Sequence, residues 1–151
     1  MEQNDYHSII TVNTDISAAF ESVQKRVDDW WTPNLEGSSD KTGDEFTVHF
    51  GDTFVVFKIT ELIANKKIVW QVTDCYLSWL QDKHEWTGTT LIWEFNAEAE
   101  TVQISLTHKG LVPQVECYDS CVKGWNFFFK ESLYKLLTVG KGMPETPKSA
   151  R

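Results

Sequence analysis

His108 is the residue whose type and place in the sequence could best support chemistry. It ends the alternating segment "TVQISLTH", in which Val102, Ile104 and Leu106 lie on the same face. An imidazole titrates near neutral pH, so a histidine on an apolar face can hydrogen-bond a ligand or act as a general acid or base. The alternative is a structural histidine that bonds a backbone carbonyl beside Gly110. We favour this alternative, because buried polar groups usually find structural partners.

The cysteines are the second group that could carry chemistry. Cys117 and Cys121 lie four residues apart in a segment with helical periodicity, so both side chains face one way. His108 and Asp119 are near in sequence, but their spacing matches no zinc pattern. With Cys75 the number of cysteines is odd, and the segment "MEQNDYHS" shows no export signal. The sequence therefore predicts reduced thiols in a cytoplasm, with no metal and no cofactor.

Other catalytic patterns are missing from the sequence. No paired carboxylates fall on an inner face, and no Ser-His-Asp arrangement is readable. The "GKG" that begins at Gly140 lacks the pattern of a phosphate-binding loop. An enzyme therefore has no motif in its support, and His108 is the candidate catalytic residue if there is one.

Composition narrows the classes of protein further. The 151 residues suit one domain, and the formal net charge is -8 without any run of Lys and Arg, so nucleic-acid binding is not expected. No apolar run approaches the ~18 residues that a membrane span requires. Seven tryptophans are many for this length, and such rings suit a core built around a cavity as well as a solid one. We expect a cytoplasmic monomer.

The elements that must position these residues follow from the hydrophobic period. "HSIITVNT" reads as a strand, and Thr14 or Asp15 then caps a helical region that ends at Trp30 and Trp31 before Pro33. After a polar loop the period becomes two, which predicts further strands at 45–50, 53–62, 68–74, 89–95 and 101–108. From about 115 to 138 the hydrophobic period returns to 3.6 residues, which predicts a long C-terminal helix. This order predicts an α+β fold, with residues 1–139 as one domain and 140–151 as a flexible tail.

The segment "CVKGWNFFFKESLYKLL" is the long helix that would cover the sheet. Trp125, Phe128 and Phe129 lie on its apolar stripe, while Phe127 turns about 100° away from Phe128. Gly124 costs about 1 kcal/mol relative to alanine inside a helix. A close backbone approach or room for a ligand would explain its presence.

Four stretches in this order resemble a known family. They are the helix pair "AAFESV…VDDWW", the strands "GTTLIWEF" and "VQISLTHKGL", and the helix "GWNFFFKESLYKLL". The chain resembles the START-like superfamily, also called helix-grip, birch-pollen-allergen-like or SRPBCC, over residues 6–138. Within it, the chain is similar to the family named after activators of a heat-shock chaperone's ATPase. The resemblance implies a curved antiparallel sheet of about six strands around a long C-terminal helix, with two short helices after the first strand.

The resemblance also implies a hydrophobic cavity between the sheet and the helix. The superfamily includes lipid and sterol carriers, plant hormone receptors and polyketide cyclases. We therefore expect a binding protein for an apolar or aromatic small molecule, lipid-like or polyketide-like, unless the rings simply fill the core. The expected ligand-binding residues are Trp31, Phe46, Phe57, Trp70, Trp93, His108, Tyr118, Trp125, Phe128 and Phe129.

Two other functions remain open on the sequence. The first is a cyclase- or hydrolase-type enzyme that uses the same cavity with His108 as acid or base. It would need a second polar residue of the inner face within hydrogen-bond reach of His108. The second is a protein that interacts with a chaperone, which would need a contiguous exposed apolar patch outside the cavity. The polar outer faces of the strands do not favour it.

Overall fold

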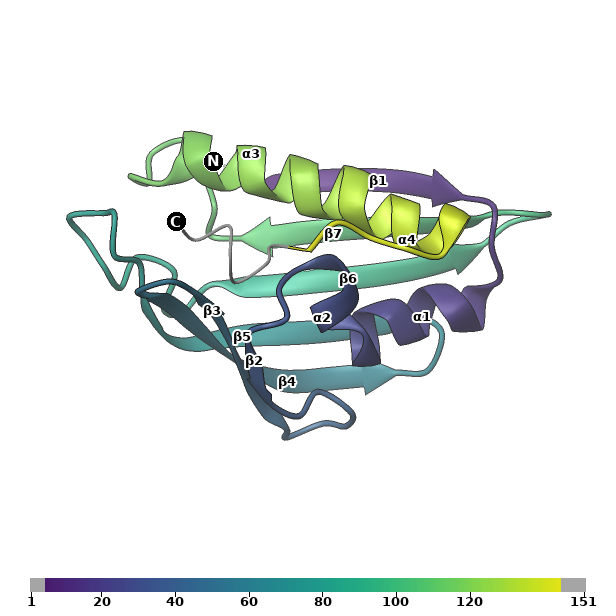
Figure 1. Ribbon diagram of the computed structural model, residues 1–151, viewed down its shortest axis with the longest axis horizontal. Helices are drawn as coiled ribbons and strands as arrows, with labels where there is room; N and C mark the ends of the chain where they lie inside the picture. Colours follow the sequence, from purple (N-terminus) through teal and green to yellow (C-terminus); the bar gives the residue numbers. More distant parts are fainter. Residues whose placement is uncertain (1–4, 145–151) are drawn as a thin grey trace.

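The computed structural model describes residues 5–144, which form an antiparallel sheet that curves around one long helix (Figure 1). The order β1-β7-β6-β5-β4-β3-β2 means that β2 to β7 follow one another as neighbours and that β1 pairs with β7. The strands are β1 (Tyr6–Val12), β2 (Leu35–Gly37), β3 (Glu45–Phe50), β4 (Thr53–Ile63), β5 (Lys67–Tyr76), β6 (Thr90–Ala97) and β7 (Val102–Lys109).

The period of two decides which side chains face the interior. In the hairpin of β3 and β4, Phe46 pairs with Phe57 and Val48 with Val55, and all four side chains are buried. Gly51 sits in the turn at a φ of 64°, a conformation that glycine adopts without steric cost. The predicted hairpin and its inward face are therefore confirmed.

The sheet owes part of its curvature to the pairing of β4 with β5. Their register shifts between Val56 and Phe57 and again between Ile59 and Glu61. Shifts of this kind bend a strand and increase its twist. The curved sheet can then follow the surface of the helix that lies on its concave side.

Two short helices follow β1, as predicted: α1 (Ile16–Lys25) and α2 (Val27–Trp30). Asp15 caps α1, because its Oδ1 accepts a hydrogen bond from the backbone N–H of Ala18 at 2.8 Å. The indole Nε1 of Trp30 donates to the Ser22 carbonyl at 2.9 Å, which fixes α2 against α1.

The C-terminal helix is continuous but changes its pitch: α3 (Tyr118–Phe127), the π-helical turn η1 (Phe128–Leu133) and α4 (Tyr134–Val139). The wider π-helical turn brings Phe129, Ser132 and Leu133 to the interior, where all three are buried. The Ser132 hydroxyl donates to the Trp30 carbonyl at 2.7 Å and so ties the helix to α2. Gly140 ends the helix in the left-handed conformation.

One strand differs from the prediction. Residues 32–44 read as a loop, yet Leu35–Gly37 forms β2 and pairs with β3, which gives a seventh strand in the described part of the chain. Three residues are too few to show an alternating pattern. Gly37 has a φ of 94°, and a Cβ at this position would collide with the Glu45 carbonyl.

The first residues of the expected flexible tail pack against the helix. The backbone N–H of Met143 donates to the Ser132 hydroxyl at 2.6 Å, and Gly142 lies buried beside the Asp29 carbonyl. Residues 145–151, which complete the expected tail, lie outside the described residues.

Candidate functional site

The space between sheet and helix is filled by aromatic rings. Trp70 packs edge-to-face against Trp93 at 5.1 Å between ring centroids, and Trp93 packs in the same way against Phe129 at 5.8 Å. Several residues expected to bind a ligand are thus fully buried core residues that line neither of the pockets described below: Phe46, Phe57, Trp70, Trp93, His108 and Phe129. Tyr118, the first residue of α3, is half-buried and lines neither pocket.

Trp31 closes the interior toward one end of the fold. Its ring lies 5.0 Å from that of Trp125, and it is parallel to that of Trp70 at 6.3 Å. Only 4% of Trp31 is exposed. The outer side of the same ring lines a pocket, so Trp31 separates that pocket from the buried core.

Beyond Trp31 lies a surface pocket of about 150 Å³ between α3 and the segment that joins β5 to β6, residues 77–89, which we call the β5–β6 link. Its lining is apolar except for Ser120. We call it the aromatic pocket, and it is lined by Trp31, Phe50, Trp79, Trp86, Ser120, Cys121, Gly124, Trp125 and Phe128.

A second hollow of about 360 Å³ continues from the aromatic pocket toward β4. Trp31, Trp79 and Trp86 line both. The second hollow adds two hydroxyls, those of Thr53 and Ser78, which lie 2.9 Å apart. Small-molecule sites commonly occupy about 300–1,000 Å³ and combine apolar walls with a few polar groups. The second hollow, at about 360 Å³, falls in this range, and the smaller aromatic pocket adjoins it.

Sequence reasoning identified only part of this wall. It named Trp31, Trp125 and Phe128 and offered room for a ligand as one reason for Gly124, but it did not place Phe50, Trp79, Trp86, Ser120 or Cys121 at a pocket. The two missed tryptophans belong to a link without hydrophobic periodicity, so no pattern placed them. The sequence did carry a usable signal, because two tryptophans in an irregular segment of a small protein are unusual.

Gly124 lies where α3 borders the aromatic pocket. A Cβ built at this residue meets no atom within 4 Å. Of the two reasons that the sequence offered for a glycine here, room beside a pocket is therefore the one that the structure supports. Close backbone approach is excluded.

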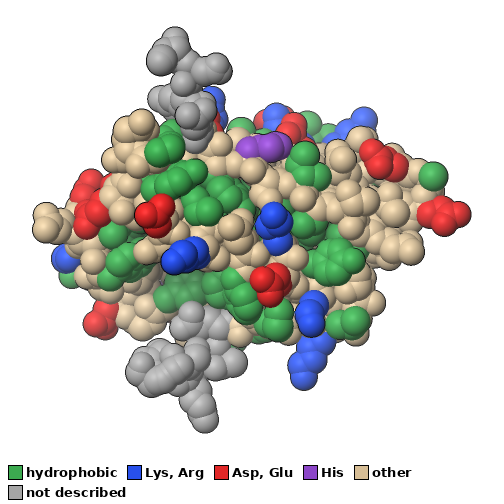
Figure 2. All heavy atoms as spheres, turned by 90° about the horizontal axis from the view of Figure 1, so that it is seen from above, with side chains coloured by type: hydrophobic (Ala, Val, Ile, Leu, Met, Phe, Trp, Pro, Cys, Tyr) green, Lys and Arg blue, Asp and Glu red, His purple; other side chains and the backbone are tan. Residues whose placement is uncertain are grey.

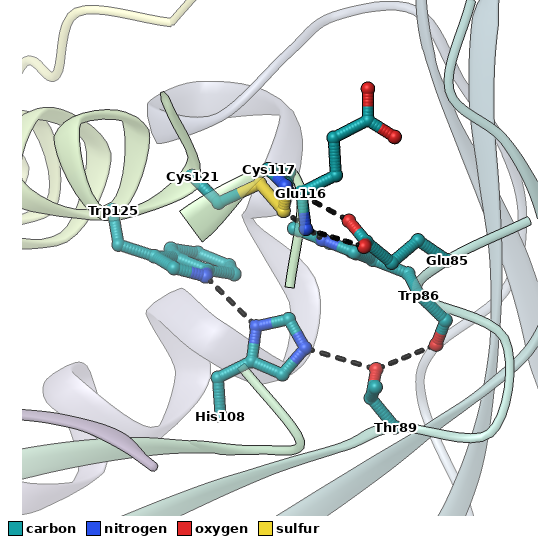
Figure 3. Close-up of a disulfide and its surroundings, with 8 residues drawn as sticks. All are labelled: Glu85, Trp86, Thr89, His108, Glu116, Cys117, Cys121 and Trp125. Carbon is teal, nitrogen blue, oxygen red and sulfur yellow. Dashed lines mark hydrogen bonds between the residues drawn. A yellow bond between two sulfur atoms is a disulfide. The ribbon is translucent and has the colours of Figure 1, made fainter. Parts of the chain in front are cut away.

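His108 is held by two side chains (Figure 3). The indole Nε1–H of Trp125 donates to its Nδ1 at 3.2 Å, so the proton of the neutral ring is on Nε2. Nε2 then donates to the Thr89 hydroxyl at 3.0 Å, and that hydroxyl donates to the Trp86 carbonyl at 2.7 Å. These bonds favour the structural interpretation of His108, but its partners are two side chains and not the expected backbone carbonyl.

Burial lowers the pKa of His108 to about 3. A ring with this pKa stays neutral near pH 7. Its one acceptor atom, Nδ1, already accepts the hydrogen bond from Trp125. Thr89 is a second polar group within hydrogen-bond reach, as an enzyme would require, but it anchors the ring to the β5–β6 link. The geometry gives His108 a positioning role for Trp86 and Trp125, two rings of the pocket wall.

Two glutamates bind the β5–β6 link to the start of α3. The Glu85 carboxylate accepts hydrogen bonds from the backbone N–H groups of Glu116 at 2.6 Å and Cys117 at 2.9 Å (Figure 3). In return the Glu116 carboxylate accepts from those of Gln81 and Asp82. These bonds lower the pKa of Glu116 below its usual value. The reciprocal pair sets the width of the pocket, since the link and α3 form its opposite walls.

The expectation of three reduced thiols is wrong for two of them. Cys117 and Cys121 form a disulfide, with their Cα atoms 5.6 Å apart, while Cys75 is a buried free thiol. Helical spacing correctly placed both side chains on one face. The inference of reduced thiols from the odd number of cysteines and the missing export signal was wrong for this pair. The indole Nε1–H of Trp86 donates to Cys117 Sγ at 3.3 Å, so the disulfide is joined to the pocket wall.

Across residues 5–144, no group of three or more His, Cys, Asp or Glu side chains is arranged to hold a metal ion. In the same range, no helix is both long enough and apolar enough to cross a bilayer.

Comparison with known proteins identifies the family. The family model for the activator of Hsp90 ATPase homolog 1-like protein matches residues 19–138. The chain belongs to this family. The expected helix-grip fold is thereby confirmed. Among curated proteins, no significant sequence match is found.

Solved structures share the fold of this chain. The Aha1 dimer of Colwellia psychrerythraea matches with a TM-score of 0.75 and 21% identity, over 92% of this chain and 99% of that one. DynU16, from the dynemicin biosynthetic locus, matches with a TM-score of 0.67 and 17% identity, over 93% of this chain and 49% of that one. An Hsp90 activator from Plasmodium falciparum matches with a TM-score of 0.64 and 18% identity, over 87% of this chain and 92% of that one. At these identities the structures establish the fold alone.

Proposed function

We propose that this protein binds an apolar or aromatic small molecule in the aromatic pocket and the hollow beside it. The observation that carries the proposal is the pocket wall itself, in which Trp79 and Trp86 of the β5–β6 link face Trp125 and Phe128 of the C-terminal helix. Flat rings offer large contact areas to an apolar ligand. Shape and apolar burial would provide the affinity.

Polar anchors for the ligand are the hydroxyls at the inner end of the second hollow. Thr53 and Ser78 bond each other, and each hydroxyl retains capacity for a further hydrogen bond. They replace His108 in the expected role of anchor, because both ring nitrogens of His108 already have partners. A ligand that is apolar with one carbonyl or hydroxyl at its end matches this arrangement.

The test is an NMR titration with naringenin, lauric acid and emodin, which represent flavonoids, lipids and polyketide-derived aromatics. The indole N–H signals of Trp79 and Trp86 should shift with the compound that binds. The indole of Trp30, bonded to the Ser22 carbonyl in the interior, is the internal reference.

Gly124→Leu is the matched variant for this titration. A leucine here extends into open space beside the pocket without meeting another atom at its Cβ, and it also favours the helix. Binding should be lost while the fold is retained. The proposal fails if none of the three compounds shifts Trp79 or Trp86, or if the variant binds as well as the wild type.

A role as a chaperone partner is the second candidate, favoured by the family match and by the structural neighbour that is an Hsp90 activator. Figure 2 shows one face of the molecule, on which hydrophobic side chains alternate with charged and polar ones. Exposed large apolar residues come from several elements, among them Ile9, Ile63, Trp79 and Tyr134. Measuring the ATPase rate of purified Hsp90 with and without this protein tests the candidate, and an unchanged rate would exclude activation.

A further inference from the structure

The disulfide sits at the edge of the aromatic pocket. Cys121 lines the pocket and is 7% exposed, whereas Cys117 lies behind it and is 1% exposed. The bond spans only four residues of sequence. A disulfide that closes so short a loop restricts the unfolded chain less than one that closes a long loop. Its placement on a pocket wall therefore calls for an explanation other than stabilisation of the fold.

We propose that this disulfide is an exchange site for a small uncharged thiol, which enters the aromatic pocket and forms a mixed disulfide with Cys121. The pocket brings the incoming thiol to Cys121 Sγ and not to Cys117 Sγ, because only Cys121 belongs to the lining. The lining carries no charged side chain, so it favours an uncharged thiol over a charged one.

The exchange is a displacement at sulfur. The thiolate R–S⁻ attacks Cys121 Sγ and forms the R–S–Sγ bond. The bond between Cys121 Sγ and Cys117 Sγ breaks, and its electron pair stays on Cys117 as a thiolate. Cys117 then takes a proton from water. The small thiol is the reductant, and no other co-reactant is needed.

The surroundings of Cys117 stabilise the thiolate that forms when this cysteine is the leaving group. The Trp86 indole N–H already points at its sulfur, and a hydrogen bond of this kind strengthens when the sulfur becomes negative. Cys117 also occupies the N-cap position of α3, where partial positive charge favours an anion. Glu85 acts in the opposite direction, because its carboxylate bonds the Cys117 N–H and repels the new charge.

Mass spectrometry of the full chain, purified without reductant, tests the site of attack. The protein is treated with benzyl mercaptan, quenched with iodoacetamide and mapped by peptide. The benzylthio group should be on Cys121 and the carbamidomethyl group on Cys117. Buried Cys75 should remain unmodified as long as the protein is folded. The reverse labelling overturns the proposal, as does finding three free thiols in the untreated, unfolded chain.

Exchange rates test the pocket route and the leaving group. Trp86→Phe keeps a ring but removes the N–H, and it should slow the exchange by up to about tenfold. Glu85→Gln removes the opposing charge and should speed it. Gly124→Leu should slow it by narrowing the pocket. All three differences should vanish in guanidinium chloride, and rates unchanged by these variants in the folded state would refute the mechanism.

Glutathione provides the comparison for the thiol class. Relative to its rate with the unfolded chain, this charged thiol should react with the folded protein much more slowly than benzyl mercaptan does. Equal relative rates would refute entry through the apolar pocket. The proposal does not depend on the binding of naringenin, lauric acid or emodin, so a chain that binds none of them can still show exchange at Cys121, and the two proposals fail separately.

Discussion

At the scale of single residues, burial explains why His108 stays neutral, and its hydrogen bonds suit the neutral ring. Its Nδ1 accepts from the indole N–H of Trp125, which can only donate. A proton added at Nδ1 would therefore face another N–H and break this bond. Alternation along β7 was enough to predict that His108 points inward. It could not reveal Trp125 and Thr89 as partners, since these come from other elements.

The buried neutral state of His108 should make stability depend on pH. The pKa of His108 is about 3 in the folded protein, against an ordinary histidine pKa of 6.5 in the unfolded chain, so between these pH values the unfolded chain binds more protons. Stability is therefore full above about pH 6.5 and is lost as the pH falls, by at most about 1.4 kcal/mol per pH unit. Urea unfolding at a series of pH values from 7 to 5 measures this slope.

His108→Gln is the variant for that prediction. It removes the titrating ring, so its stability should be lower at pH 7 but nearly independent of pH over the same interval. The pKa of Glu116 lies below 4.5, so the stability that this carboxylate contributes to the protein is lost only below the interval from pH 7 to 5. Parallel pH curves for the wild type and the variant would show that His108 is not the source.

Gly124 allows a prediction in which two glycines of one helix are compared. Gly124→Ala should stabilise the protein by about 0.5–1 kcal/mol, because alanine favours the helix and its Cβ meets no atom. Gly140→Ala also meets no atom but has a φ of 85°, and it should destabilise by about 1 kcal/mol. Denaturant midpoints of the two variants should move in opposite directions. Equal shifts would mean that backbone conformation does not decide the effect.

At the scale of elements, the sequence predicts regular segments well and irregular ones poorly. Alternation identified the strands that have an inward face, and Asp15 was correctly named as one of two possible helix caps. The π-helical turn at Phe128–Leu133 was not predicted, because three consecutive phenylalanines fit several helical pitches. The β5–β6 link has no hydrophobic period, and its fixed position depends on partners about 30 residues away, Glu116 among them.

The Glu85–Glu116 pair makes the position of the link sensitive to acid. Backbone hydrogen bonds from Gln81 and Asp82 lower the pKa of Glu116. The bonds that the Glu116 carboxylate accepts are therefore intact above the usual value of 4.5, and they are lost as the pH falls through the lowered pKa of Glu116. The amide proton shifts of Gln81 and Asp82 should move together with a midpoint below pH 4.5, as followed by NMR.

Glu116→Gln should abolish that joint titration while the link stays in place near neutral pH, since an amide oxygen can still accept one of the bonds. The Ala18 amide, which bonds the Asp15 carboxylate at the cap of α1, is an independent reference in both proteins. Unchanged titration of Gln81 in the variant would assign the shift to another group.

At the scale of the whole molecule, the resemblance predicted the architecture but not where space remains. Which side chains face the concave side of the sheet follows from the sequence. How far their rings reach does not, and here Trp31, Trp70 and Trp93 fill the interior. The indole N–H groups of Trp70 and Trp93 are buried and have no hydrogen-bond partner within residues 5–144. Such groups cost about 1–3 kcal/mol each, so the packing of their rings must outweigh this cost.

Trp31 is the ring that keeps the interior separate from the aromatic pocket, so its removal should join the two. Trp31→Ala should destabilise the protein by about 3–5 kcal/mol and leave a cavity of aromatic shape beside Trp70 and Trp125. Indole has the shape of the missing side chain. It should restore stability by about 2.7 kcal/mol when present at 100 times its Kd, as measured by the thermal midpoint. Trp31→Leu leaves a smaller cavity and should lose less stability and gain less from indole.

The matched control for this rescue is Trp79→Ala, because Trp79 lines the same pocket but is 53% exposed. Its loss should cost no more than about 1 kcal/mol, since surface substitutions seldom cost more. Indole should raise the midpoint of this control and of the wild type far less than that of Trp31→Ala, because their interiors stay closed. An equal rise in all three proteins would mean that indole binds at the surface and that Trp31 is not the barrier. No rise in Trp31→Ala would mean that the neighbouring rings collapse into the vacated space, which would make the interior a solid core that no ligand can enter.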